Sequence, residues 1–91
     1  MNPIQTQLKW EEKSLKKFNT MLVKIPLFHR EIAKTVVVKK AEINAQERGA
    51  TQVEETDIVR AFLSEVPKAF YSLMIRLMDE VGLDHEKYEE K

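Results

Sequence analysis

The chain contains no cysteine among its 91 residues. Disulfide bonds, thiolate zinc sites, cysteine-ligated iron–sulfur clusters and thiol nucleophiles all require the thiol of cysteine, so the sequence excludes them. It also lacks any apolar run near the roughly 20 residues that a membrane-spanning helix needs. Its N-terminus does not have the basic-then-apolar pattern of a secretory signal. We therefore expect a soluble, cytoplasmic protein with no membrane partner.

Residues that form turns are also scarce. Only two glycines and three prolines occur, whereas 33% of the residues are charged. This composition leaves little room for hairpin turns and favours helices. The sequence therefore predicts an all-α fold in one domain over residues 1–91, with four helices, one of them long and central, and a short C-terminal helix. A domain of this size has only a small core, so self-association is an open alternative.

Apolar residues at helical spacing place the first two helices. The first is predicted over about residues 10–24, with an apolar stripe of Leu15, Phe18, Leu22 and Ile25. Pro26 ends this helix or begins the next. The second is predicted over about residues 27–48 and is closed by Gly49. It is apolar on two faces, Phe28, Ile32, Val36 and Ile43 on one and Val37, Ala41 and Ala45 on the other. We expect this helix to be central, with neighbours on both sides.

The second half of the chain predicts two further helices. Residues 50–53 should be briefly extended, and Glu54 or Glu55 should begin the third helix. Pro67 ends or kinks that helix, and a fourth helix is expected from there to Val81. Gly82 is the next stop signal, and a short terminal helix is predicted over residues 84–88.

The net charge of zero conceals an asymmetry. Residues 1–48 carry ten basic and five acidic residues, and residues 49–91 carry five basic and ten acidic residues. The two halves could attract each other, pair head-to-tail between subunits or bind an anion. Solvated helix faces are the simpler interpretation.

Several residues of the first two thirds follow a known pattern. They are Leu8, Trp10, Pro26, Phe28, Arg30, Ala45, Gly49, Val53 and Ala61. Over about residues 8–63 the chain resembles the PCP_red family, the small helical domain at the C-terminus of the B subunit of light-independent protochlorophyllide reductase. The intervals on either side of Pro26 are each about one helical turn longer than in that pattern. Residues 64–91 have no counterpart in it and form an extra helical region.

A second resemblance is to the histone fold. Its residues are Gly49, Val53, Asp57, Ile58 and Ala61, which are spaced like the end of a long central helix, a loop and a third helix. The loop at residues 50–52 lacks the arginine–threonine pair of DNA-binding histones, and this half of the chain is acidic. Since phosphate neutralisation dominates DNA affinity, nucleic-acid binding is not the expected function, although it stays an alternative.

Three residues are candidates for a binding site: His29, Arg30 and Glu42. Arg30 could clamp a propionate or phosphate, and His29 could donate a proton or ligate the metal of a tetrapyrrole. Only the PCP_red resemblance implies a tetrapyrrole. In the simpler alternative, Arg30 binds a carboxylate or the carbonyls that end the first helix, His29 faces water and Glu42 is a solvated salt-bridge residue. The sequence predicts no metal site, no cofactor and no catalytic group, because it contains no paired ligands, phosphate loop or triad pattern.

The fourth helix carries the best candidate for an interface. Its apolar stripe is Phe70, Leu73, Met74, Leu77, Met78 and Val81. Methionines pack against varied shapes, which suits a docking surface. The alternative is that these residues are core. The sequence thus predicts a non-catalytic helical module that binds a protein partner or itself, accessory to a partner complex such as the PCP_red resemblance implies, with a histone-like dimer as the alternative.

Overall fold

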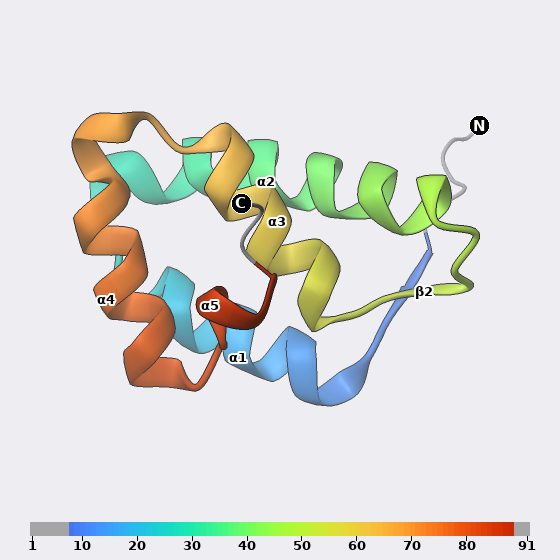
Figure 1. The fold of residues 1–91 in the computed structure, drawn as a ribbon. Coiled ribbons are helices and arrows are strands. Elements are labelled where there is room, and N and C mark those ends of the chain that lie inside the picture. Colours follow the sequence, from blue (N-terminus) through green and yellow to red (C-terminus); the bar gives the residue numbers. More distant parts are fainter. Residues whose placement is uncertain (1–7, 89–91) are drawn as a thin grey trace.

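The computed structural model describes residues 8–88 and confirms the all-α class (Figure 1). In chain order the elements are β1 (Lys9–Trp10), α1 (Glu12–Leu22), α2 (Leu27–Glu47), β2 (Gln52–Val53), α3 (Glu55–Glu65), the 3-10 turn η1 (Lys68–Phe70), α4 (Tyr71–Val81) and α5 (His85–Tyr88). No helix within this part of the chain is both long enough and apolar enough to cross a bilayer.

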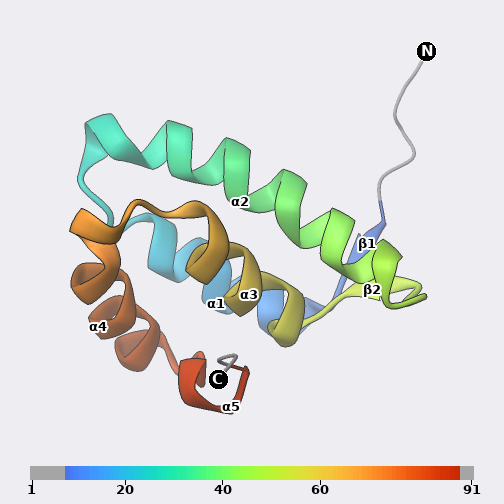
Figure 2. The same ribbon diagram turned by 45° about the horizontal axis from the view of Figure 1, so that its top comes forward.

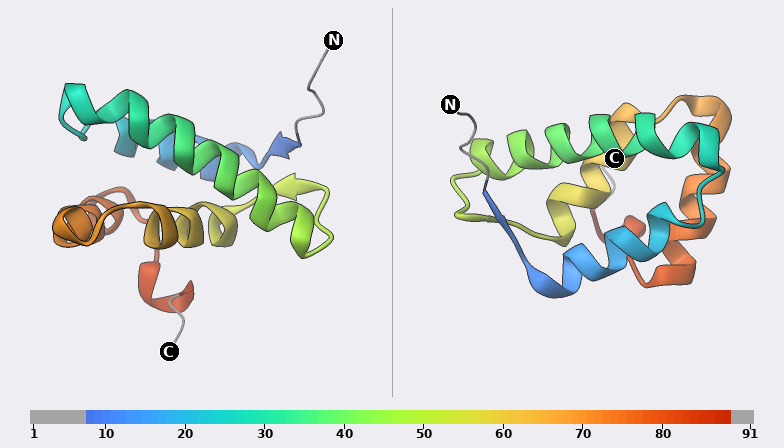
Figure 3. Two further views of the ribbon diagram at one scale, coloured as in Figure 1. Left: turned by 90° about the horizontal axis from the view of Figure 1, so that it is seen from above. Right: turned by 180° about the vertical axis from the view of Figure 1, so that it is seen from behind.

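The helices form a flat bundle, and different elements lie at its two ends. α2 runs along one edge of the molecule and packs chiefly against α3, while α1 contacts both α3 and α4 (Figures 1 and 2). The turn between α1 and α2 lies beside the connection between α3 and α4, and the two strands lie at the opposite end (Figure 3).

The first helix is shorter than predicted, because Trp10 belongs to a strand. β1 pairs in parallel with β2, Lys9 with Gln52 and Trp10 with Val53. The extended segment after α2 has backbone groups that need partners, and β1 supplies them. A two-residue strand has no periodicity, so the apolar pattern could not reveal it.

The predicted bounds of the second helix agree with α2 to within one residue. Gly49 follows it with a φ of 72°, which is the left-handed conformation expected of a residue that closes a helix. The face carrying Val37, Ala41 and Ala45 is fully buried. The expectation that α2 is covered on both sides was wrong, because the first half of its other face is open to solvent. An apolar stripe shows that a face avoids water, not that the same chain covers it.

The core lies where α1, α2, α3 and α4 meet. Phe62 of α3 is fully buried at its centre, and its ring centroid is 5.8 Å from that of Phe18. The ring of Phe18 in turn lies 5.4 Å from Trp10. The same cluster includes Met21 of α1, Val37 of α2, Ile58 of α3 and Met78 of α4. Every long helix therefore contributes to one core.

The residues expected to end helices in the second half of the chain do so. α3 ends before Pro67, and the predicted fourth helix begins as the 3-10 turn η1. Gly82, with a φ of 86°, ends α4. Its carbonyl accepts a hydrogen bond from Lys17 Nζ at 3.0 Å, and the same ammonium group pairs with Glu55 at 3.2 Å. Lys17 therefore joins α1 to the start of α3 and to the end of α4.

Candidate functional site

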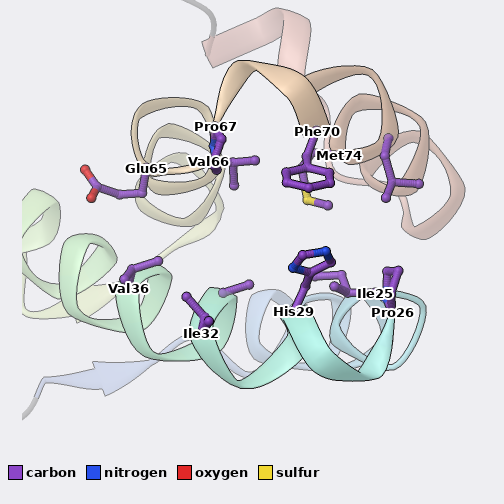
Figure 4. A pocket seen from close by; sticks show the side chains of 12 residues that line it. Ile25, Pro26, His29, Ile32, Val36, Glu65, Val66, Pro67, Phe70 and Met74 are labelled. Carbon is purple, nitrogen blue, oxygen red and sulfur yellow. The ribbon is translucent and has the colours of Figure 1, made fainter.

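An apolar groove lies between the first half of α2 and the connection from α3 to α4 (Figure 4). It encloses about 310 Å³. Its apolar lining includes Ile25, Ile32, Val36, Val66, Phe70 and Met74, and its polar side chains are His29 and Glu65. A concave, largely apolar surface with few polar groups is typical of a binding site.

His29 lies in this groove and does not simply face water. Its ring points across the gap toward Phe70 (Figure 4), and the two ring centroids are 4.8 Å apart. On its own helix, the ring of His29 lies 4.1 Å from that of Phe28, centroid to centroid. The side chain is half-buried. The imidazole therefore forms part of an aromatic wall, and no group of three or more potential metal ligands occurs with it or elsewhere in residues 8–88.

Arg30 points away from the groove and closes the turn between α1 and α2. Its Nη2 donates to the carbonyls of Val23 and Ile25, both at 3.0 Å, and its Nε donates to Ile25 at 3.3 Å. These are carbonyls left without partners where α1 ends. The structure thus favours the simpler interpretation of Arg30, in which it caps the first helix.

Replacing Arg30 by alanine should therefore destabilise the fold. We expect a loss of about 1–2 kcal/mol in the free energy of unfolding, because charged hydrogen bonds to carbonyls are lost from a half-buried site. Urea denaturation followed by circular dichroism measures this. Lys34→Ala, at an exposed position of the same helix, is the control and should change little. Equal stability of both variants would contradict the capping role.

Glu42 lies far along α2 from the groove. Its Oε2 accepts a hydrogen bond from Trp10 Nε1 at 3.1 Å, which fastens β1 to α2. The three predicted binding residues therefore do not converge on one site. His29 lines the groove, whereas Arg30 and Glu42 each hold a neighbouring segment in place.

The predicted interface stripe of α4 is divided in the structure. Phe70, Leu73 and Met74 line the groove, while Leu77 and Met78 are buried in the core. Val81 is half-buried and packs against that core. Met74 is itself only 4% exposed, so Met74, Leu77, Met78 and Val81 match the core alternative, and only Phe70 and Leu73 are placed where a partner could reach them.

Four large apolar side chains are exposed in the turn between α1 and α2 and in the first half of α2, the segments that border the groove on one side. Their exposed fractions are 65% for Val23, 71% for Leu27, 77% for Phe28 and 66% for Ile32. Only one other large apolar residue of the described chain, Leu15, is exposed, at 37%. We call these four side chains together with the groove the apolar end. Val23 and Leu27 lie on either side of the turn at Pro26 and belong to neither predicted apolar stripe, so the apolar periodicity of the sequence did not identify them.

The shortest salt bridge among the described residues lies at the other end of α2 from the groove. Arg48, just after α2, donates from Nε and Nη2 to the two carboxylate oxygens of Asp57 at 2.8 and 2.7 Å. Asp57 is only 1% exposed, and its Oδ2 also accepts a hydrogen bond from the backbone of Glu54 at 2.9 Å. The hydrogen bond to Asp57 is the main cause that raises the pKa of Arg48 above its ordinary value. The pair fixes the loop between α2 and α3, with Asp57 buried and the Arg48 side chain 38% exposed.

Comparison with known protein families matches residues 4–91 to one described as "Protein of unknown function (DUF2621)". The chain belongs to the DUF2621 family. No curated protein matches this DUF2621 chain. No solved structure matches it either, so the histone-fold resemblance gains no support from that comparison.

The resemblance to the PCP_red family was wrong, because nearly the whole chain falls in another family. The residues that carried it have local structural roles in this DUF2621 protein. Arg30 caps α1, Gly49 closes α2, and Ala45 and Ala61 are fully buried small residues. Helix ends and closely packed helices need such residues in many folds, so their spacing is a weak sign of kinship.

Proposed function

We propose that this DUF2621 protein is a non-catalytic helical interaction module and that the apolar end is its docking surface. The observation that carries the proposal is the clustering of exposed Val23, Leu27, Phe28 and Ile32 beside an apolar groove. Monomeric proteins expose single apolar residues freely, but a contiguous patch next to a concavity is characteristic of a surface that binds another protein.

The composition of the surface also supports protein binding. Interface centres are enriched in aromatic residues, and the apolar end supplies the exposed Phe28 and the half-buried Phe70. The groove is bordered by helices, a shape that accepts the apolar side chains of a partner helix. The remaining polar groups, His29 and Glu65, would fix the orientation of the partner.

Site-specific photo-crosslinking in the cells that make the protein tests this proposal. A photoreactive residue at position 28 should yield a covalent adduct with a defined polypeptide. The matched control places the same residue at the exposed Arg60 of α3, where no adduct is expected. A second change, Ile32→Glu, should abolish the adduct at position 28, because a charge would be buried in an apolar contact. Absence of any polypeptide adduct at position 28 would refute the docking role.

The histone-like dimer remains the alternative function. The observation in its favour is the long α2 followed by a loop and α3, in the order that the sequence predicted. It requires a dimer. A sedimentation measurement that gave the mass of one chain, 10.7 kDa, at high micromolar concentration would therefore rule it out. For this dimer, weak or no binding of nucleic acid stays the prediction.

A further inference from the structure

We propose that α5 is a releasable strap, which covers one side of α3 and opens locally while the rest of the fold stays intact. α5 lies on the side of α3 that faces away from α2 (Figure 3), and it packs against both α3 and α4. This side of the molecule is separate from the apolar end, and its behaviour does not depend on the docking role proposed above.

A hydrogen bond locates the covered side of α3. The backbone N–H of Asp84, the residue before α5, donates to Glu55 Oε2 at 3.0 Å. Val59 follows Glu55 by four residues, so it lies one turn further along the same side of the helix. The side chain of Val59 is fully buried. Opening of α5 would therefore expose the side of α3 that carries Val59.

A buried nitrogen without a partner makes the closed position of α5 costly. His85, the first residue of α5, is only 9% exposed. Its Nε2 lies 3.1 Å from Asp79 Oδ1, and an ionised carboxylate can only accept, so Nε2 is the donor. Nδ1 is buried and has no hydrogen-bond partner among the described residues. A neutral ring then has an unsatisfied lone pair there and a charged ring an unsatisfied N–H, so both states carry the cost, and water removes it once α5 opens.

Two contacts that hold α5 closed are weak, whereas the residue before them is firmly held. The carboxylate of Asp79 is 64% exposed, so water competes with His85 for it. The hydrogen bond from Asp84 to Glu55 also lies at the surface. Leu83, by contrast, is 1% exposed, and its N–H donates to the carbonyl of Met78 at 2.8 Å. The boundary between the fixed core and the strap therefore lies just after Leu83, and α5 can open without disturbing α4.

Labelling of single introduced thiols in the full chain tests the strap, because the chain has no cysteine of its own. Val59→Cys places a thiol beneath α5, and Val37→Cys makes the same change at a fully buried position of α2. At neutral pH a thiol reagent should label position 59 at least about 10-fold faster than position 37, because local opening costs less free energy than global unfolding. Circular dichroism should show that both variants are folded.

Removing the unpartnered nitrogen should close the strap more tightly. In the chain that carries Val59→Cys, His85→Leu replaces the imidazole by an apolar side chain, so labelling at position 59 should slow by at least about fivefold. The control is Asp79→Asn, which keeps an acceptor oxygen but removes the charge. It should change the labelling rate by less than about twofold, because an exposed ion pair contributes little.

Two results would overturn the proposal. Equal labelling rates at positions 59 and 37 would show that α5 does not open by itself, and this comparison does not require the His85 variant. A rate that is unchanged or faster after His85→Leu would show that the imidazole does not loosen α5.

Discussion

Replacing Phe62 by alanine is expected to lower the free energy of unfolding by about 3–5 kcal/mol, the usual effect of removing a buried aromatic ring. The ring is fully buried in α3 and contacts Phe18, so its loss leaves a cavity where α1 and α3 meet. Small domains are stable by only about 5–15 kcal/mol in total. The variant should therefore be partly unfolded or close to it at physiological temperature.

Urea denaturation measured by circular dichroism determines this change. The matched control is Phe28→Ala, which removes the same ring from a position that is 77% exposed. At low micromolar concentration, where self-association is minor, the control should change the free energy of unfolding by less than about 0.5 kcal/mol. If the two variants were equally stable, Phe62 could not lie at the centre of the core.

Removal of the Arg48 side chain should have the second-largest effect. We expect Arg48→Ala to cost about 2–4 kcal/mol, because it leaves the carboxylate of Asp57 buried without its cationic partner. Two short hydrogen bonds are lost, and only the backbone N–H of Glu54 still donates to that carboxylate. The Arg48 side chain is itself 38% exposed, which lets water reach the site and keeps the effect below that of a fully buried pair.

Thermal and urea denaturation together test the role of this pair. Arg60→Ala, at an exposed arginine of α3, is the control and should change stability by no more than about 0.5 kcal/mol. The double variant Arg48→Ala with Asp57→Asn should recover part of the loss, because the unpaired charge is then absent. A double variant less stable than Arg48→Ala alone would show that the buried carboxylate is not the cause.

Features that depend on residues close together in the chain could be predicted from the sequence. The helix over residues 27–48, the stops at Gly49 and Gly82 and the capping alternative for Arg30 follow from periodicity and from local backbone chemistry. Contacts between distant segments did not follow. Trp10 binds Glu42 and Arg48 binds Asp57 through chain folding, and no local pattern in the sequence relates either pair.

The candidate site likewise combines residues that the sequence identified with residues that it missed. The sequence identified His29, Phe70, Leu73 and Met74, residues that meet in the groove although they come from separate helices. It could not distinguish Phe70 and Leu73 from Leu77 and Met78, because the apolar residues of one stripe look alike in the sequence whether they face the core or a partner. It also missed Val23 and Leu27, whose exposure is decided by the turn at Pro26.

The sequence by itself determined the helical class, the approximate positions of the four long helices and the absence of cysteine chemistry. These properties depend on composition and on spacing along the chain. Only the tertiary structure decided that one face of α2 stays uncovered and that a groove lies beside it. The physical reason is that apolar periodicity records which side chains avoid water, whereas the packing of α3 and α4 against α2 determines which of them find cover within the chain.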